Sequence, residues 1–225
     1  MKNLPDKSID CFMCDLPYGI TDCDWDTPID LQGFWEQVRR LCKTKNTPVL
    51  MFCNTKFGYS LIQSNSKWYR YDLVWNKERG VNFLLANKMP MKSHEMIYVF
   101  SEGGAFYKRI DISGDFPSFK PYISPRNKAK IYATVGYNTV GNDGTHRCPL
   151  SVINIRKQNT LGHNTEKPKE LYEWLLKRYC PDGGTVLDPT AGSFNSIMVA
   201  KSLGLKGIGI EKDRDIYWKG VGKVV

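Results

Sequence analysis

The sequence has little that would place the protein in a membrane or outside the cell. Its 225 residues include no apolar run of the roughly 20 residues that a membrane-spanning helix needs. The first ten residues, MKNLPDKSID, lack the apolar core of a secretory signal peptide. The seven cysteines are an odd number in a chain large enough to bury a core without disulfide bonds. We therefore expect a cytoplasmic protein.

Sequence patterns for a metal site are also missing. Cys11 and Cys14 form one CxxC pair, but no second pair and no histidine cluster lies at the spacing of a zinc site. Cys148 and Cys180 are isolated. We therefore expect no bound metal.

Positive charge is concentrated in one part of the chain. The formal net charge is +9 and favours a polyanionic partner. Residues 106–157 hold nine Lys or Arg against three Asp, a net of +6 (9 − 3), with aromatic residues interleaved. A solvated loop region rich in lysine is the alternative. We favour a nucleic-acid-facing insertion, and the candidate contacts there and just upstream are Lys92, His94, Lys120, Arg126, Lys128, Lys130 and Arg147.

Around this insertion, strand and helix patterns alternate. Apolar runs predict strands, and apolar residues at three- and four-residue spacing predict helices. The alternation predicts an α/β fold with a doubly wound, mostly parallel sheet. The predicted strands span 9–13, 48–53, 70–75, 95–100, 185–188 and 206–211, and the predicted helices span 30–42, 57–63, 165–179 and 196–203.

The most informative short stretch is CDLPYG, residues 14–19. It follows a predicted buried strand, which Pro17 and Gly19 end. Ligands bind at the carboxyl ends of strands in open α/β sheets. There the Asp15 carboxylate and a backbone carbonyl can each accept one N–H of an amino group, while Tyr18 stacks on its heterocycle. Taken alone, the stretch equally fits an ordinary Pro-Gly turn with a surface tyrosine.

A second candidate site lies in VLDPTAGSFN, residues 186–195. The order is strand, small-residue loop and helix, and Glu211 ends the next strand. A loop that lets the backbone approach a ligand, followed by an acid for ribose hydroxyls, is typical of nucleoside binding. Gly192 is the only glycine in the loop, so a ribose and adenine without pyrophosphate fit better. An ordinary turn with Glu211 at the surface is the alternative.

Together these blocks resemble the S-adenosylmethionine-dependent DNA amino-methyltransferases. CDLPYG resembles their DPPY motif, and VLDPTAGS resembles their DPFxGxG cofactor motif. The DPPY-like block comes before the cofactor loop, which is the β-class order, and DLPYG followed closely by WD is similar to enzymes carried by phages and prophages. Further blocks match in family order: WD at 25–26, VWNK at 74–77, KSHEMIYVF at 92–100, HNTEKPKELYEWLL at 163–176 and GIGIEKD at 207–213.

The resemblance implies a Rossmann-like class I methyltransferase fold and a reaction. One domain over 1–225 would contain a catalytic half (1–105), a basic target-recognition insertion (106–159) and a cofactor-binding half (160–225). The cofactor would be S-adenosyl-L-methionine, and the substrate a flipped-out adenine N6 amine in double-stranded DNA. The resemblance further implies a bacterial or phage-infected host cell, a role of the restriction-modification type, and a homodimer of the kind that some β-class relatives form.

The resemblance also assigns roles to numbered residues. Asp15 and the Leu16 carbonyl would accept the two amine N–H groups, Pro17 would fix the turn, and Tyr18 would stack on the base. An aspartate at the first position goes mostly with adenine N6, and a serine mostly with cytosine N4. The implied cofactor residues are Asp188, Pro189, Thr190 and Gly192 in the loop, Glu211 for the ribose, and Thr165 and Lys167 for the methionine carboxylate.

Three departures from the family pattern affect the cofactor end. Thr190 replaces the usual phenylalanine, and Phe194 stands where the last glycine is common. Phenylalanine is expected not to adopt the backbone angles that glycine permits, so we expect a different loop shape and weaker cofactor binding. Only LPDKSID precedes the first strand, so adenine contacts from an upstream element are expected to be absent or supplied differently. Alternatives are cytosine N4 methylation, DNA binding without turnover, and methylation of RNA or a protein amide.

Overall fold

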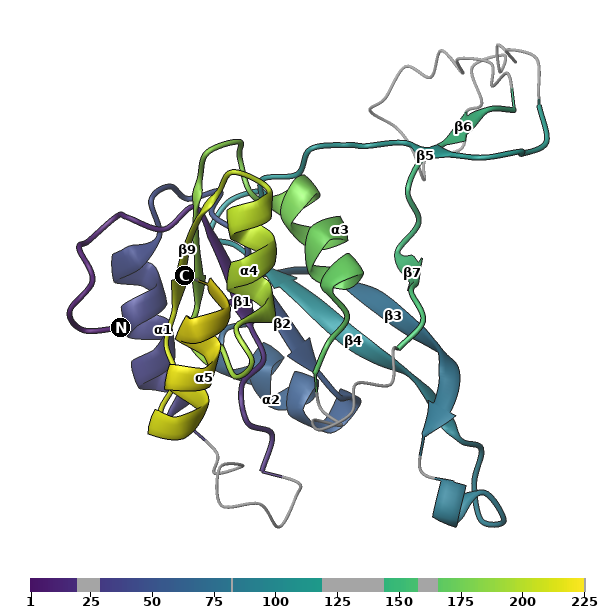
Figure 1. Cartoon of the computed structure of the whole chain (residues 1–225), viewed down its shortest axis with the longest axis horizontal. Coiled ribbons are helices and arrows are strands. Elements are labelled where there is room, and N and C mark those ends of the chain that lie inside the picture. The colour runs from purple at the N-terminus through teal and green to yellow at the C-terminus, as the bar shows by residue number, and fades with distance from the viewer. Residues whose placement is uncertain (20–28, 82, 119–143, 158–165, 225) are drawn as a thin grey trace. The chain divides into compact units, whose positions relative to one another are not determined.

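The computed structural model describes residues 1–19, 29–81, 83–118, 144–157 and 166–224. The chain divides into two compact units (Figure 1). The first unit comprises Met1–Lys108 and Ser151–Val225, and the second comprises Arg109–Leu150. In the described part of the second unit, β5 (Ile112–Ser113) pairs antiparallel with β6 (His146–Arg147). The second unit lies inside the predicted 106–159 insertion, whose role in target recognition stays a prediction.

The first unit is built on one seven-stranded sheet. Strand β4 is antiparallel to both of its neighbours, and all other neighbouring strands are parallel. The prediction of a mostly parallel α/β sheet is therefore confirmed, although the reversed strand was not predicted. The strand order is β7 (Val152–Asn154), β3 (Tyr69–Val81), β4 (Lys92–Phe100), β2 (Val49–Cys53), β1 (Cys11–Cys14), β8 (Thr185–Asp188) and β9 (Lys206–Gly209).

Helices cover both faces of the sheet because its central strands are apolar on both sides. Along β1, Cys11 and Met13 pack into one core cluster, whereas Phe12 and Cys14 pack into the other. Helix α3 (Lys169–Tyr179) and part of α4 (Asn195–Ser202) cover the first face. Helices α1 (Leu31–Leu41) and α2 (Thr55–Ser64) cover the second. The sheet is therefore doubly wound, as predicted.

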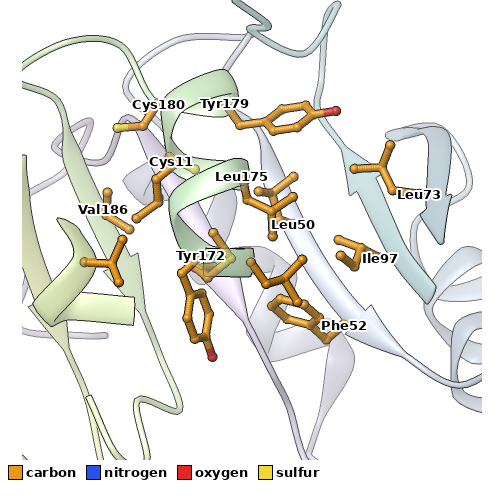
Figure 2. Packing of buried hydrophobic residues seen from close by; sticks show 14 of the residues in the cluster. Cys11, Leu50, Phe52, Leu73, Ile97, Tyr172, Leu175, Tyr179, Cys180 and Val186 are labelled. Atoms are coloured by element: carbon orange, nitrogen blue, oxygen red, sulfur yellow. The ribbon is translucent and has the colours of Figure 1, made fainter. Parts of the chain in front are cut away.

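Helix α3 shows how an amphipathic pattern becomes core packing. Its residues Tyr172, Leu175 and Tyr179 face the sheet, where they meet Leu50 and its neighbours from the central strands (Figure 2). Three- and four-residue spacing places these side chains on one helical face. This packing fixes the segment just before α3, which enters the candidate site.

Two helix starts illustrate how capping sets the boundaries. The Asp30 carboxylate accepts from the backbone N–H groups of Gln32 at 2.9 Å and Gly33 at 3.1 Å, so α1 begins where predicted. Helix α3 begins at Lys169, with Pro168 at the N-cap position and no side-chain cap, so the predicted start at residue 165 was wrong. Proline disfavours helical geometry in the residue before it, which explains the later start. Thr165, the expected cap, lies outside the described residues.

The β3–β4 hairpin is much longer than predicted. The two strands pair from Tyr69 with Phe100 out to Val81 with Lys92, past the end of β2 at Cys53. Their outer halves are rich in polar and charged residues. In a single segment such a composition indicates a loop, because the pairing with a partner strand cannot be seen in the sequence.

Helix α5 (Arg214–Val224) packs on α4 through Phe194 and Tyr217. Within the described ranges, we find no helix with the length and apolarity needed to cross a bilayer.

Candidate active site

The two sequence motifs meet at one edge of the sheet. Strands β1 and β8 are parallel neighbours, with Phe12 paired to Leu187, so the segments that follow them emerge side by side. The Thr190 hydroxyl donates to the backbone carbonyl oxygen of Asp15 at 3.0 Å. CDLPYG and the loop beginning at Asp188 therefore form one continuous surface.

Asp15 is held by two side chains. One carboxylate oxygen contacts the Lys167 ammonium group, and the other accepts a hydrogen bond from the Tyr18 hydroxyl at 3.0 Å. The Tyr18 ring stacks on Phe57, with 5.0 Å between centroids, so a base could stack only on its other face. The Leu16 side chain is buried in the core cluster that α1 and α2 cover. This packing anchors the turn at a position where the family motif has proline.

A chain of alternating charges extends from Asp15 into the protein. Lys167 exposes only 5% of its side chain, and its Nζ lies 3.9 Å from a Glu95 carboxylate oxygen and 4.6 Å from the Phe52 ring centroid. Glu95 in turn pairs with Lys77. Burial alone would lower the pKa of Lys167, but the carboxylates of Asp15 and Glu95 raise it above its ordinary value. Burial opposes ionisation of Glu95, yet Lys167 and Lys77 hold its pKa below the ordinary value.

Neither Glu95 nor Lys77 was predicted to be a site residue. Both lie in blocks that match the family, VWNK and KSHEMIYVF, but each stands among other polar residues, so the local sequence does not set them apart. Lys167 was expected to reach the methionine carboxylate of the cofactor. In the structure its described ion pairs are with Asp15 and Glu95, which connect it directly to the DPPY-like motif.

The cofactor-type loop is held together by carboxylates that accept backbone N–H groups. Asp188 accepts from the Thr190 N–H at 3.0 Å and from the Ser196 hydroxyl. Glu211 accepts from the Gly192 N–H at 2.8 Å and from the Asp213 N–H at 2.9 Å. These bonds fix the Glu211 carboxylate beside the loop.

We expect Asp188 to make the protein less stable as the pH rises from about 4 to about 7. Burial raises the pKa of its carboxyl group from 3.8 to about 7, although the hydrogen bonds from Ser196 and Thr190 oppose this. Between those values the folded protein retains a proton that the unfolded chain has released, so stability falls with rising pH, by up to about 4 kcal/mol. Asp188→Asn removes the titration and keeps an oxygen acceptor for Thr190.

Urea unfolding of the wild type and Asp188→Asn at pH 4 and pH 8 tests this expectation. The difference in free energy of unfolding, variant minus wild type, should be more positive at pH 8 than at pH 4 by up to about 4 kcal/mol. Comparing the two proteins cancels the titration of all other groups. A difference that does not change with pH would contradict the expected role of Asp188.

Phe194 overturns the expectation that phenylalanine could not take glycine's backbone angles here. It has φ 63° and ψ 16°, in the left-handed region, directly before α4. Its ring is buried with Ala191, Ile197 and Tyr217. Added Cβ atoms at Gly209 and Gly220 would lie 2.7 and 2.2 Å from the ring, so these two glycines make room for it. Burial of the ring therefore offsets the cost of the backbone conformation.

We expect Phe194→Gly to lower the free energy of unfolding by about 2 kcal/mol. Removing the buried ring should cost about 3 kcal/mol, the low end for phenylalanine truncation, and relief of the left-handed conformation should return about 1 kcal/mol. Urea unfolding measures the difference, and Phe194→Leu, which fills most of the space, is the control. Equal or greater stability of Phe194→Gly would show that strain outweighs packing at this position.

The predicted DNA contacts are only partly described. Lys92 and exposed His94 lie on the outer half of β4. Arg147 lies on β6 of the second unit, with its guanidinium carbon 4.5 Å from the Phe116 ring centroid. In the described part of the chain, no cluster of three or more His, Cys, Asp or Glu side chains could hold a metal ion. Five of the predicted site residues lie outside the described ranges: Lys120, Arg126, Lys128, Lys130 and Thr165.

Comparison with known proteins finds one family. A family model described as DNA methylase, covering N6 and N4 methyltransferases, matches residues 9–218. Type II methyltransferase M.HpaI of Haemophilus parainfluenzae is 25% identical over 96% of this chain and 68% of its own length. Type II methyltransferase M.HinfI of Haemophilus influenzae is 23% identical over 95% of this chain and 62% of its own length.

Solved structures share the fold at low sequence identity. The M1.HpyAVI–SAM complex gives a TM-score of 0.61 at 15% identity, covering 96% of this chain and 89% of that one. The PvuII DNA methyltransferase, which is cytosine-N4-specific, gives 0.68 at 12% identity, covering 100% of this chain and 82% of that one. At these identities the likeness establishes the fold alone.

Proposed function

Because the chain belongs to the DNA methylase family of N6 and N4 methyltransferases, we propose that it methylates the N6 amine of adenine in a specific DNA sequence. S-adenosyl-L-methionine is the cofactor of this family. The observation that carries the proposal is the placement of Asp15. Its carboxylate is oriented by Lys167 and Tyr18 and lies beside the loop that begins at Asp188.

The proposed chemistry addresses a weak nucleophile. An exocyclic amine conjugated to a purine ring attacks poorly unless its lone pair is freed from the ring and aimed at the methyl group. The Asp15 carboxylate and the Leu16 carbonyl would each accept one N–H, which favours a pyramidal nitrogen, while Pro17 fixes the turn. The cofactor supplies an electrophilic sulfonium methyl group. The residues of this chain would act mainly by orientation, holding the amine nitrogen in line with that methyl group, and Asp15 would be the nearest acceptor for the proton that the amine loses.

The proposed cofactor site is compatible with the contacts that its residues already make. Glu211 uses one lone pair of each carboxylate oxygen for a backbone N–H, which leaves acceptor sites for ribose hydroxyls. The loop residues Asp188, Pro189, Thr190 and Gly192 would line the ligand. The Lys167 ammonium has three N–H donors, so it would share them between its two carboxylate partners and the methionine carboxylate.

DNA would approach the edge of the sheet where Asp15 lies. A base inside a duplex cannot reach such a carboxylate, so the target base would be flipped out and stacked on Tyr18. The second unit, with Arg147, would contact DNA and contribute to sequence recognition. A homodimer stays a prediction drawn from the family resemblance.

Cytosine N4 is the second candidate target. The aspartate at position 15 favours adenine, but the family model that matches this chain covers N4 as well as N6 methyltransferases. Methylation-sensitive sequencing of DNA from cells expressing this chain distinguishes them, because it reports both the modified base and its sequence context. Modified adenines in one sequence motif would support the proposal, and N4-methylcytosine would replace it with the second candidate.

A tritiated-methyl transfer assay separates this function from other classes. Unmethylated DNA, RNA and protein are each offered to the wild type and to Asp15→Ala. Labelled DNA with the wild type alone supports the proposal. Labelled RNA or protein instead of DNA would overturn it, and transfer to nothing would leave a DNA-binding protein without turnover.

A further inference from the structure

The tip of the β3–β4 hairpin carries an apolar surface that the proposed chemistry does not use. The tip, residues 83–91, begins with the short helix η1 (Phe83–Leu85). Leu84 is 88% exposed and Phe83 is 73% exposed, and Leu85, Met89 and Met91 are exposed beside them. Contiguous exposed apolar side chains mark interaction sites in soluble proteins. The hairpin tip is therefore a candidate contact surface.

Hydrogen bonds hold this tip in one shape. The Phe83 carbonyl accepts from the Ala86 N–H at 3.0 Å, and the Leu85 carbonyl accepts from the N–H groups of Lys88 at 2.8 Å and Met89 at 3.0 Å. A Cβ at Gly80 would lie 2.8 Å from the Cβ of Met91, so glycine is needed where the strand passes this side chain. The apolar side chains are thus presented by a preformed turn.

The tip projects from the edge of the sheet that carries the candidate active site. Strand β2 ends at Cys53, which pairs with Met96, and β4 continues beyond this point toward the tip (Figure 1). Glu95, on that continuation, pairs with Lys167, which contacts Asp15. At about 3.4 Å per residue, Met91, directly before β4, lies roughly 14 Å along the chain from Glu95. A bound duplex that reaches Asp15 can therefore also reach the tip.

The charge around the tip favours DNA over a second copy of the chain. Residues 78–92 contain Arg79, Lys88 and Lys92 against the single acid Glu78, a net of +2 (3 − 1). Lys77, just before them, is buried and paired with Glu95, so it is not counted. Phosphates are attracted to such a surface, whereas the same surface of a second molecule would be repelled. Apolar side chains that enter DNA from a basic surface unstack neighbouring base steps.

We propose that the hairpin tip inserts Leu84 and Phe83 into the DNA duplex beside the target base and stabilises the base in its flipped-out position. This inference rests on the proposed function and adds a surface to it. The tip would occupy the gap in the stack while Asp15 and Tyr18 hold the extruded base. Its contribution is needed for duplex DNA and not for single strands, whose bases are already accessible.

The test compares Phe83→Ala/Leu84→Ala with the wild type on two forms of one substrate. PCR-amplified, unmethylated bacterial DNA is offered as duplex and as heat-denatured single strands, with a tritiated methyl donor. We expect at least a tenfold lower rate on duplex and less than a twofold change on single strands. Leu84→Met, which keeps a long apolar side chain, should retain the duplex rate within threefold. Val152→Ala, an exposed apolar position outside the hairpin, should change neither rate.

A second measurement does not depend on methyl transfer. Permanganate oxidises thymines that have lost their partner base, so it reports flipping in the bound duplex. The double variant should lose this reactivity while its affinity for the duplex changes less than threefold. Equal losses on both DNA forms, an unchanged duplex rate, or a dimeric wild type that the variant converts to monomer would each overturn the hairpin proposal. A wild type that transfers no methyl group overturns the proposed function instead, and the permanganate result still tests the hairpin.

Discussion

Replacing Asp15 with alanine is expected to lower methyl transfer to DNA by a factor on the order of 10²–10⁴. The carboxylate is the acceptor that would orient the target amine, and Lys167 and Tyr18 fix its position. No other described side chain in the DPPY-like block offers a charged acceptor at this place. Transfer of a tritiated methyl group to unmethylated duplex DNA measures the rate, and calorimetry measures cofactor binding, which should change much less than the rate.

The control for this substitution is Asp182→Ala. Asp182 exposes 88% of its side chain and pairs with Lys108, away from the described site residues. Its removal should leave the transfer rate within twofold of the wild type. Tyr18→Phe keeps the ring and removes only the hydroxyl hydrogen bond to Asp15. Its loss of transfer rate should lie between those of Asp182→Ala and Asp15→Ala. A rate for Asp15→Ala equal to that of the wild type would refute the assigned role.

Replacing Lys167 with methionine is expected to lower both stability and turnover. The substitution leaves the carboxylates of Asp15 and Glu95 near each other without the ammonium group that pairs with both. Removing one partner of a buried ion pair costs about 3–5 kcal/mol, and we expect about 3 kcal/mol because Asp15 keeps 31% side-chain exposure. Turnover should fall at least tenfold, since Asp15 loses one of the two contacts that orient it.

The pH at which the stability of Lys167→Met is compared with that of the wild type follows from the titration of Lys167. Because its carboxylate partners raise the pKa of Lys167 above the ordinary value of 10.5, the contribution of the pair is fully present below that pH. It is lost only as the pH rises through the higher value of the folded state. Urea unfolding at pH 8 therefore measures the whole effect.

Lys177→Met is the matched control for Lys167→Met. Lys177 pairs with Glu173 one helical turn away on α3, and both side chains are nearly half exposed. Such a surface pair contributes about 0.3–0.5 kcal/mol. If the two lysine substitutions destabilise the protein equally, the buried charge chain has no special role. If Lys167→Arg is as stable as the wild type but has the low turnover of Lys167→Met, the position of the ammonium group near Asp15 matters in addition to its charge.

Local patterns predicted six strands of the main sheet and helices α1 to α4, but not β7 or α5. They also placed each motif at the carboxyl end of a strand, and the pairing of β1 with β8 in the structure brings the two motifs together. The roles of Asp15 and Asp188 stay predictions. The charge chain could not be predicted, because Lys77, Glu95 and Lys167 are far apart in sequence and only the sheet register brings them together.

Phe194 shows where a local rule fails. Its backbone conformation is unfavourable for phenylalanine when the residue is considered alone. The space for its ring is created by Gly209 and Gly220, which lie 15 and 26 positions later in the chain. Neither glycine could be connected with position 194 from spacing alone. The same reason explains the hairpin, whose polar outer strands are stabilised by each other.

The second unit is attached to the first at two points, each fixed by a backbone hydrogen bond within the sheet-containing unit. The Lys108 N–H donates to the Arg178 carbonyl at 2.7 Å, and the Ser151 carbonyl accepts from the Val74 N–H at 2.8 Å. Everything between these anchors, Arg109–Leu150, makes its own compact body. Exchange of the segment between the two anchors therefore replaces this body without altering the seven-stranded sheet. If this body reads the DNA sequence, as proposed, one such exchange changes the sequence specificity and leaves the residues around Asp15 as they are.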